Sequence, residues 1–596
     1  MRMRRPRTLP PSLPDAAPAE ESPPADARKR RRAQRRARRT QETADRSLKE
    51  TLESVVVAFV LAFTFRVYVL EAYIIPTGSM APTLLGSHVE AGCPQCGRRV
   101  VADAGPLRDR AVDAARCPMC FARVPLAEAP GLPPAVRAGD RILVQKYLGG
   151  VAAPRRYDVV VFKNPQNPFG AGQNFIKRLC GLPGERLMLL DGNVYVAPEP
   201  EDPDAPDAAL PWRIARKTDA GANPRAEQIQ RAAFLPVYHS RYVPTDGGQT
   251  AGGARRWALP WSSTVGAWRV DGNRFAPQAG AAPGATPGAT PGADHWELGF
   301  DFTPVGGRPG YLRPAAIYPY NQLGYGPGDL DVFEDFRLAV TLGPGEGRGG
   351  DAGPVEVTLG GVTRLREGPV EVRARFGAGS VVLETRPAPD AAWGRLAASA
   401  AGVGLPAAGA RPRLELWVAD QELSAFVDGE RVAAYRFELG FEELLSRPAP
   451  PRPAAQALRV GLAGAGAPAV VLTDLDLDRD LYHHAGRISG FRGGVNRAVD
   501  GRVRPDRVRP VRLAEDRYFL IGDNSPQSDD GRRWTGVDPW IRARYFPETP
   551  LAEATGRVPG GLLIGRAFLV YYPAARPLRP GGAAVVPDVA RMRRIH

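Results

Sequence analysis

The sequence IPTGSMAPTL, residues 75–84, follows directly on an apolar run that begins at Val55. Ser79 lies in this sequence next to Gly78, and a glycine at this place is typical of a tight turn. A serine is a poor nucleophile until a base takes its proton. The pattern therefore predicts a nucleophile held close to a membrane surface, with its base supplied from elsewhere in the chain.

The apolar run predicts a membrane anchor. It covers the 21 residues 55–75 if Arg66 and Glu71 are tolerated within it, and a transmembrane helix needs ~20. Arginines crowd residues 28–39, and positive charge marks the cytoplasmic side of such a helix. We therefore expect a disordered basic cytoplasmic tail over 1–46 and a transmembrane helix over 47–75. A helix that lies on the membrane surface is the alternative.

Composition limits the classes of fold and of partner. The chain has 596 residues and a net charge of +15, with much of the excess before residue 40. Because no aromatic residues are interleaved with these arginines, we expect contact with anionic membrane lipids and no nucleic acid. The 66 glycines and 61 prolines predict linkers and turn-rich β structure. A chain of this length predicts two to four domains.

Lys177 is the best candidate for the base. None of the six histidines lies in a recognisable catalytic motif. A lysine can act as a base only if burial lowers its pKa toward neutrality. If residues 174–180 form a strand, Lys177 shares a face with Phe175 and Leu179. The sequence therefore predicts that Lys177 pairs with Ser79.

Several blocks of the chain resemble the type I signal peptidases, which are membrane-bound Ser/Lys endopeptidases. In chain order, these blocks are residues 76–84, 139–146, 157–162, 175–185, 522–532 and 558–567. The resemblance implies a mostly antiparallel β fold with Ser79 as nucleophile and Lys177 as general base. It also implies that the Thr77 hydroxyl and the backbone N–H of Ser79 bind the oxyanion.

The block GDNSPQSDDGR at 522–532 carries the supporting residues that the resemblance implies. Ser528 matches the serine that orients the lysine amine, and Asp530 and Arg532 match a supporting ion pair. The chain departs from the family pattern at residues 525–527, where the family more often has charged residues.

The resemblance implies that the chain cleaves N-terminal signal peptides from exported preproteins and needs no cofactor for catalysis. The basic tail predicts a cytoplasmic N-terminus and an extracytoplasmic catalytic domain, and the sequence has no second apolar run of adequate length, so we expect a single-pass protein. The resemblance implies that the membrane is the bacterial inner (cytoplasmic) membrane. A self-cleaving Ser/Lys peptidase is one alternative function. An envelope-binding scaffold with an inert peptidase core is the other.

A first insertion, residues 87–136, contains CPQC at 93–96 and CPMC at 117–120. Two such pairs with 20 residues between them predict a zinc ribbon. Four thiolates close the coordination of the ion, so the zinc would be structural. Its expected ligands are Cys93, Cys96, Cys117 and Cys120. Disulfides are the alternative, since an extracytoplasmic location permits them.

A second insertion separates the catalytic core into residues 76–197 and 511–596. Its composition predicts a Pro/Gly-rich linker over 198–317, a lectin-like jelly-roll β-sandwich over 318–485 and a linker over 486–510. A glycan or an envelope protein is the expected ligand of the sandwich. The fold class is therefore mainly β.

Insertions are tolerated where the chain leaves and re-enters a domain at neighbouring surface points. We therefore expect the strands before residue 198 and after residue 510 to lie side by side. The sandwich is expected to be an outlying, separately folded domain.

Overall fold

The computed structural model divides the chain into two compact units, Met1–Val69 and Leu70–His596. The described residues are 25–105, 113–120, 122–127, 134–147, 153–169, 174–202, 205–245, 258–278, 295–301, 320, 335–345, 354–365, 368–406, 410–440, 443, 445, 458–484, 494–495, 510–573, 576–577, 585–586 and 588–596. The expectations for residues 1–24, for the Pro/Gly repeat at 282–292 and for most of 486–510 concern residues outside these ranges.

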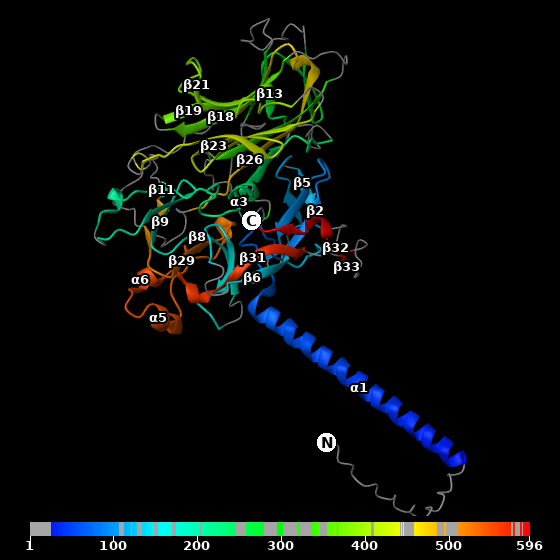
Figure 1. Cartoon of the computed structure of the whole chain (residues 1–596). Coiled ribbons are helices and arrows are strands. Elements are labelled where there is room, and N and C mark those ends of the chain that lie inside the picture. Colours follow the sequence, from blue (N-terminus) through cyan, green and yellow to red (C-terminus); the bar gives the residue numbers. More distant parts are fainter. Residues whose placement is uncertain are drawn as a thin grey trace, which may run out of the picture. The chain divides into compact units, whose positions relative to one another are not determined.

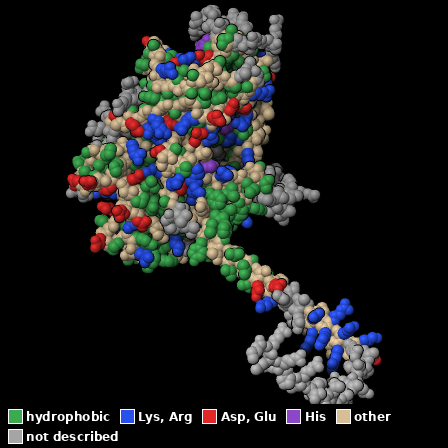
Figure 2. Space-filling view, viewed as in Figure 1, with side chains coloured by type: hydrophobic (Ala, Val, Ile, Leu, Met, Phe, Trp, Pro, Cys, Tyr) green, Lys and Arg blue, Asp and Glu red, His purple; other side chains and the backbone are tan. Residues whose placement is uncertain are grey.

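The first unit contains one long helix, α1 (Ala25–Tyr68). The predicted disorder is therefore wrong for residues 25–46, which contain many strong helix formers and neither Gly nor Pro. Lys and Arg side chains gather on the first half of this helix (Figure 2). Its second part, Lys49–Tyr68, is long and apolar enough to cross a membrane, with a mean hydropathy of 1.6.

The predicted transmembrane helix over 47–75 is too long at its C-terminal end. The helix ends at Tyr68, and Leu70–Ile74 forms strand β1. All five residues of β1 pair with β6 (Arg141–Lys146), so this end of the apolar run belongs to a sheet. Sheet pairing satisfies its backbone groups in place of helical hydrogen bonds.

The second unit is mainly β, as expected (Figure 1). The motifs that resemble those of the type I signal peptidases lie on or beside an eight-stranded sheet. Its order is β1-β6-β31-β7-β8-β29-β30, and β34 pairs with β31. The remaining strands of this sheet are β7 (Val159–Lys163), β8 (Asn174–Gly181), β29 (Arg517–Ile521), β30 (Val558–Pro559), β31 (Leu563–Tyr572) and β34 (Arg593–Arg594). The strands predicted around 142, 160 and 177 are therefore confirmed as β6, β7 and β8.

A smaller sheet shows where the second insertion leaves and re-enters the core. Its order is β11-β10-β9-β27, and β28 also pairs with β9. Its strands are β9 (Glu185–Leu190), β10 (Asn193–Pro198), β11 (Arg213–Ile214), β27 (Gly494–Val495) and β28 (Val511–Leu513). Strand β28 pairs directly with β9, so a strand before residue 198 and one after residue 510 lie side by side, as expected, while β10 pairs with the other edge of β9.

The second insertion forms two sheets, of eight and seven strands. The first has the order β14-β15-β26-β17-β22-β23-β24 with β12 beside β26, and the second has the order β13-β16-β25-β18-β19-β20-β21. Strands of the first sheet are β12 (Leu235–His239), β14 (Ala267–Asp271), β15 (Arg274–Gln278), β17 (Phe336–Pro344), β22 (Arg413–Ala419), β23 (Glu422–Val427), β24 (Glu430–Arg436) and β26 (Val470–Arg479). Strands of the second sheet are β13 (Trp261–Val265), β16 (His295–Phe300), β18 (Glu356–Leu365), β19 (Gly368–Phe376), β20 (Val381–Arg386), β21 (Gly394–Ala398) and β25 (Leu458–Ala463). Buried residues of both sheets, among them Leu338, Leu416 and Val460, belong to one apolar core.

The predicted linker over 198–317 is wrong for the residues that the structure describes there. Helix α3 (Ala226–Ala233) and strands β11 to β16 lie within it, and five of these strands join the two sandwich sheets. In β16 the alternate residues Trp296, Leu298 and Phe300 are buried in the sandwich core. The strands are short and lie between Pro/Gly-rich segments, so the composition of the whole region concealed them.

The first insertion forms two short hairpins that pack on the sandwich. Strand β2 (His88–Gly92) pairs with β3 (Arg99–Asp103), and β4 (Ala114–Arg116) pairs with β5 (Arg123–Pro125). Their apolar side chains share one core with the sandwich, and residues 70–596 form a single compact unit. The sandwich is therefore not the outlying, separately folded domain that we expected.

Candidate active site

Ser79 lies in the turn that follows β1. The N–H of Ile75, which begins this segment, donates to the Asp140 carbonyl at 2.9 Å. The Asp140 carboxylate in turn accepts from the N–H of Leu85 at 3.0 Å. Hydrogen bonds to Asp140, which directly precedes β6, therefore hold both ends of this turn. We call residues 75–85 the serine turn. Ser79 itself is only half-buried.

Lys177 reaches Ser79 from the central strand β8. The two side-chain atoms, Lys177 Nζ and Ser79 Oγ, lie 2.8 Å apart. The amine also donates to the Ile176 carbonyl at 3.1 Å and lies 5.1 Å from the centre of the Phe175 ring. The residues are 98 positions apart in the chain, and the structure brings together the pair that the sequence predicts.

Burial favours the neutral form of the Lys177 amine. Only 3% of the residue is exposed, because β8 lies between β7 and β29 in the sheet. Desolvation lowers the lysine pKa to about 8, although the carboxylates of Asp530 and Asp529 act to raise it. Loss of water disfavours the ammonium form, so a sizeable fraction of neutral amine exists near pH 8.

The loop 522–532, which we call the catalytic loop, contains an ion pair whose charges act on this lysine. Arg532 donates to both carboxylate oxygens of Asp530, at 2.8 and 2.6 Å. Asp530 also accepts from the N–H of Gly522 at 2.9 Å. Burial alone would raise the pKa of Asp530, but Arg532 and these hydrogen bonds hold it below its usual value. The predicted pairing of Asp530 with Arg532 is confirmed.

A second buried ion pair joins β8 to the catalytic loop, and its carboxylate also binds the serine turn. Arg178 donates to both oxygens of Asp523, each at 2.7 Å. The same carboxylate accepts from the Thr83 hydroxyl at 2.5 Å, four residues beyond Ser79. Sequence reasoning missed this set. Its only local signal is that Arg178 and Asp523 each stand next to a residue of a recognised motif, Lys177 and Gly522.

Asn524 completes the contact between the catalytic loop and the turn. Its side-chain amide donates to the Gly78 carbonyl at 2.9 Å, and its backbone N–H donates to the Ser79 carbonyl at 3.1 Å. These bonds fix the peptide groups on both sides of the Ser79 Cα. Sequence reasoning also missed Asn524, although it belongs to the block GDNSPQSDDGR.

Two predicted roles are not established by the contacts. Ser528 is fully buried beside Gly522, but among the described residues no hydrogen bond joins it to the Lys177 amine. Thr77 lies two residues before Ser79 with an exposed side chain. The orienting role of Ser528 and the oxyanion role of Thr77 therefore stay predictions.

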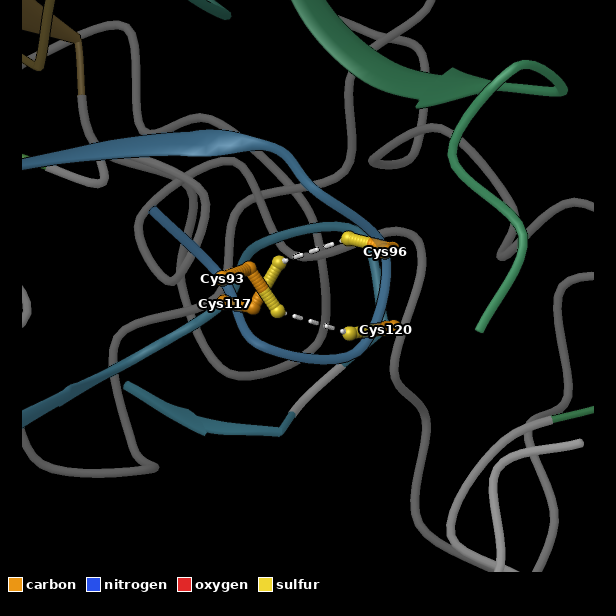
Figure 3. A group of neighbouring side chains, drawn as sticks. All are labelled: Cys93, Cys96, Cys117 and Cys120. Carbon is orange, nitrogen blue, oxygen red and sulfur yellow. Dashed lines mark hydrogen bonds between the residues drawn. The ribbon is translucent and has the colours of Figure 1, made fainter. Parts of the chain in front are cut away.

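The four cysteines of the first insertion point toward one another (Figure 3). The Sγ atoms of Cys93 and Cys120 are 3.5 Å apart, and those of Cys96 and Cys117 are 3.6 Å apart. All four lie within 4.8 Å of one another, and all five cysteines of the chain are free thiols. A tetrahedral ion with Zn–S bonds of about 2.3 Å requires sulfur separations of this size. The donor set therefore fits a structural zinc ion.

Part of this chain also matches known sequences. Residues 121–247 match the family model described as signal peptidase, peptidase S26. The chain is homologous to the signal peptidases over this segment. The segment includes Lys177 but not Ser79. The resemblance inferred from the motifs is therefore confirmed for part of the chain.

Individual relatives match over short stretches. Signal peptidase I of Leptolyngbya laminosa is 36% identical over 72 residues, which are 11% of this chain and 35% of that protein. Probable signal peptidase I-2 of Synechocystis sp. is 38% identical over 66 residues, which are 11% of this chain and 30% of that protein. The chain thus spans about a third of the length of the curated relatives it matches.

Among solved structures, a carbohydrate-binding module from Bacillus subtilis is similar to this chain. It is 9% identical and has a TM-score of 0.19, over 37% of this chain and 96% of the module. At this TM-score the likeness decides nothing about the ligand of the sandwich.

Replacing Gly522 should disturb the serine turn. A Cβ atom at this position would lie 2.4 Å from the Ser79 carbonyl oxygen and 2.1 Å from Ser528 Oγ. We expect Gly522→Ala to lower peptidase activity about 100-fold, because small misplacements of reacting groups have effects of this size. Gly536→Ala is the control, since its Cβ would meet nothing within 4 Å. Equal cleavage rates for the two variants would contradict the packing described for Gly522.

The purified chain should contain one zinc ion. We expect Cys96→Ser to lose the metal and lower the melting temperature, because the remaining three thiolates leave the tetrahedral site open. Cys180→Ala, which removes the one cysteine outside the group, should keep it. Elemental analysis and thiol counting under denaturing conditions measure both. A metal-free protein with two disulfides would show that the disulfide alternative is correct.

Proposed function

We propose that this chain is a membrane-bound serine endopeptidase that cleaves N-terminal signal peptides from exported preproteins. The observation that carries the proposal is the 2.8 Å hydrogen bond between the buried Lys177 amine and the Ser79 hydroxyl. Homology to signal peptidases over residues 121–247 supports the choice of substrate class. The pair itself supports the Ser/Lys mechanism.

In the first chemical step, the neutral Lys177 amine takes the proton of the Ser79 hydroxyl as Oγ bonds to the scissile carbonyl carbon. The carbonyl electrons move onto its oxygen. When this intermediate collapses, the C–N bond breaks and the leaving amine takes the proton from the Lys177 ammonium. Water then attacks the acyl-enzyme with Lys177 again as base, and Ser79 recovers its proton.

The Asn524 contacts support the proposed site for the oxyanion. In a trans peptide the N–H points away from the carbonyl on the other side of the bond. Because Asn524 binds the Gly78 carbonyl inside the protein, the N–H of Ser79 faces the opposite way. Together with the Thr77 hydroxyl, this N–H is our proposed pair of donors to the developing negative charge.

The long helix supports the proposed membrane location. Residues 49–68 are long and apolar enough to span a bilayer, and arginines precede them. We propose a single pass through the bacterial inner membrane with a cytoplasmic N-terminus, the catalytic unit outside and membrane lipids around the helix. Nucleic acid is not part of this proposal.

The other partners stay within the same proposal. Catalysis needs no cofactor, and the zinc ion at the four cysteines is structural. A glycan or an envelope protein is the proposed ligand of the sandwich. The alternative of a scaffold with an inert peptidase core is disfavoured by the close contact of Ser79 with a buried lysine.

Removing either reacting residue should abolish cleavage. We expect Ser79→Ala and Lys177→Ala to lower the rate of cleavage of a model preprotein at least 1000-fold, because the two residues act as one unit. Lys177→Arg should be equally inactive, since a guanidinium keeps its proton at any working pH. Cleavage by the full chain in detergent micelles is the measurement. Substantial cleavage by any of the three variants would show that another residue is the nucleophile or the base.

The pH dependence of cleavage should report the lysine. Its pKa of about 8 means that the amine is protonated and inactive at lower pH. We expect kcat/KM to rise about tenfold per pH unit below this pKa and to level off above it. The measurement is cleavage of a model preprotein between pH 6 and 10. A profile that is flat, or that falls with rising pH, would be incompatible with a lysine base.

A further inference from the structure

The second insertion contacts the catalytic loop just beyond its last sandwich strand, β26. Beyond β26 the chain reaches His484, whose backbone N–H donates to Ser525 Oγ at 2.8 Å. The carbonyl of the same residue accepts from Arg532 Nη1 at 2.8 Å. That nitrogen also donates to Ser525 Oγ at 2.5 Å. Residue 484 of the insertion is thus bound through its backbone to two residues of the catalytic loop.

A short series of contacts connects residue 484 with the serine turn. Arg532 is the partner of Asp530, which in turn accepts from the N–H of Gly522. Gly522 packs directly against the Ser79 carbonyl. Ser525, Asp530 and Arg532 are buried, with at most 2% of each residue exposed. A substitution of Ser525 that moves Arg532 is therefore expected to displace Asp530, Gly522 and, through them, the serine turn, because the contacts between them are close and buried.

A second residue of the insertion contacts the serine turn. Tyr320 is 2% exposed and shares a small apolar cluster with Ala81 and Leu85. Its hydroxyl donates to the Ser87 carbonyl at 3.0 Å. A Cβ atom built on Gly78 would lie 1.9 Å from its ring, so the ring lies against the backbone just before the nucleophile.

We propose that Tyr320 and Ser525 are positioning residues, through which the insertion holds the serine turn and the catalytic loop in the reactive arrangement. The inference rests on the proposed peptidase function. It goes beyond that function because the sandwich then belongs to the catalytic machinery. Each contact fixes the backbone on one side of the Ser79–Lys177 pair, and small errors in the placement of reacting groups reduce rates strongly.

The test compares three variants of the full chain in detergent micelles, namely Ser525→Ala, Tyr320→Ala and Ser399→Ala. Ser399 is the matched control, because its hydroxyl binds backbone groups inside the sandwich and contacts no residue of the catalytic loop or the serine turn within the described structure. Cleavage of a model preprotein is followed in single turnovers with enzyme in excess. The saturating rate constant then does not depend on the fraction of enzyme that is folded.

We expect Ser525→Ala and Tyr320→Ala to lower the saturating single-turnover rate constant at least tenfold, with half-saturation within twofold of wild type. Ser399→Ala should match wild type in both quantities. Tyr320→Phe keeps the ring against Gly78 and should recover most of the rate if Tyr320→Ala is impaired. A role in stability alone would lower the melting temperature and leave the rate constant unchanged.

Two results would overturn the inference. If both alanine variants cleave within twofold of wild type, the insertion does not position the site, although the proposed function stands. If Ser399→Ala is as slow as they are, the effect is general to the sandwich and not carried by these contacts. A wild-type chain that cleaves no preprotein would contradict the proposed function itself.

Discussion

The desolvation of one amine is the constraint on which the rest of this site depends. Lys177 is on a central strand with 3% of the residue exposed, and this burial lowers its pKa to about 8. An amine in water would keep its proton at neutral pH and could not activate Ser79. The eight-stranded sheet provides the dry environment, because β7 and β29 flank the lysine strand.

Carboxylates close to such an amine would restore its proton, so their charges must be balanced. Asp530 and Asp523 are fully buried and near the lysine, and each forms a two-point pair with an arginine, Arg532 and Arg178. Removing one partner of a buried pair typically costs about 3–5 kcal/mol, because the other charge is left in a dry environment. The Arg178–Asp523 pair also ties the catalytic loop to β8, and the hydrogen bond from the Thr83 hydroxyl to Asp523 ties the loop to the serine turn. Electrostatic balance and positioning are therefore carried by the same residues.

The contact between Ser79 and Lys177 could be predicted from the sequence because each residue lies in a short local motif. The strands around them could also be predicted, since β7 contains three successive valines and the alternation in β8 places Phe175, Lys177 and Leu179 on one face. The bond between Arg178 and Asp523 could not, because 345 residues separate them and neither motif shows the pairing. The strands within 198–301 were missed because they are short, lie in Pro/Gly-rich sequence and pair with distant strands such as β25 and β26. The contact of Ser525 with the insertion could not be predicted either, because its fully buried hydroxyl accepts from the backbone N–H of His484, 41 residues earlier in the chain.

The most direct test of this account is the titration of Lys177 itself. Its 13Cε and 15Nζ chemical shifts can be followed by NMR in the full chain in detergent micelles, and the signal can be assigned by its loss in Lys177→Arg. We expect a midpoint at a pH of about 8, because the amine is buried. A midpoint near 10.5, the ordinary value for lysine, would show that the amine is solvated and would contradict a lysine base.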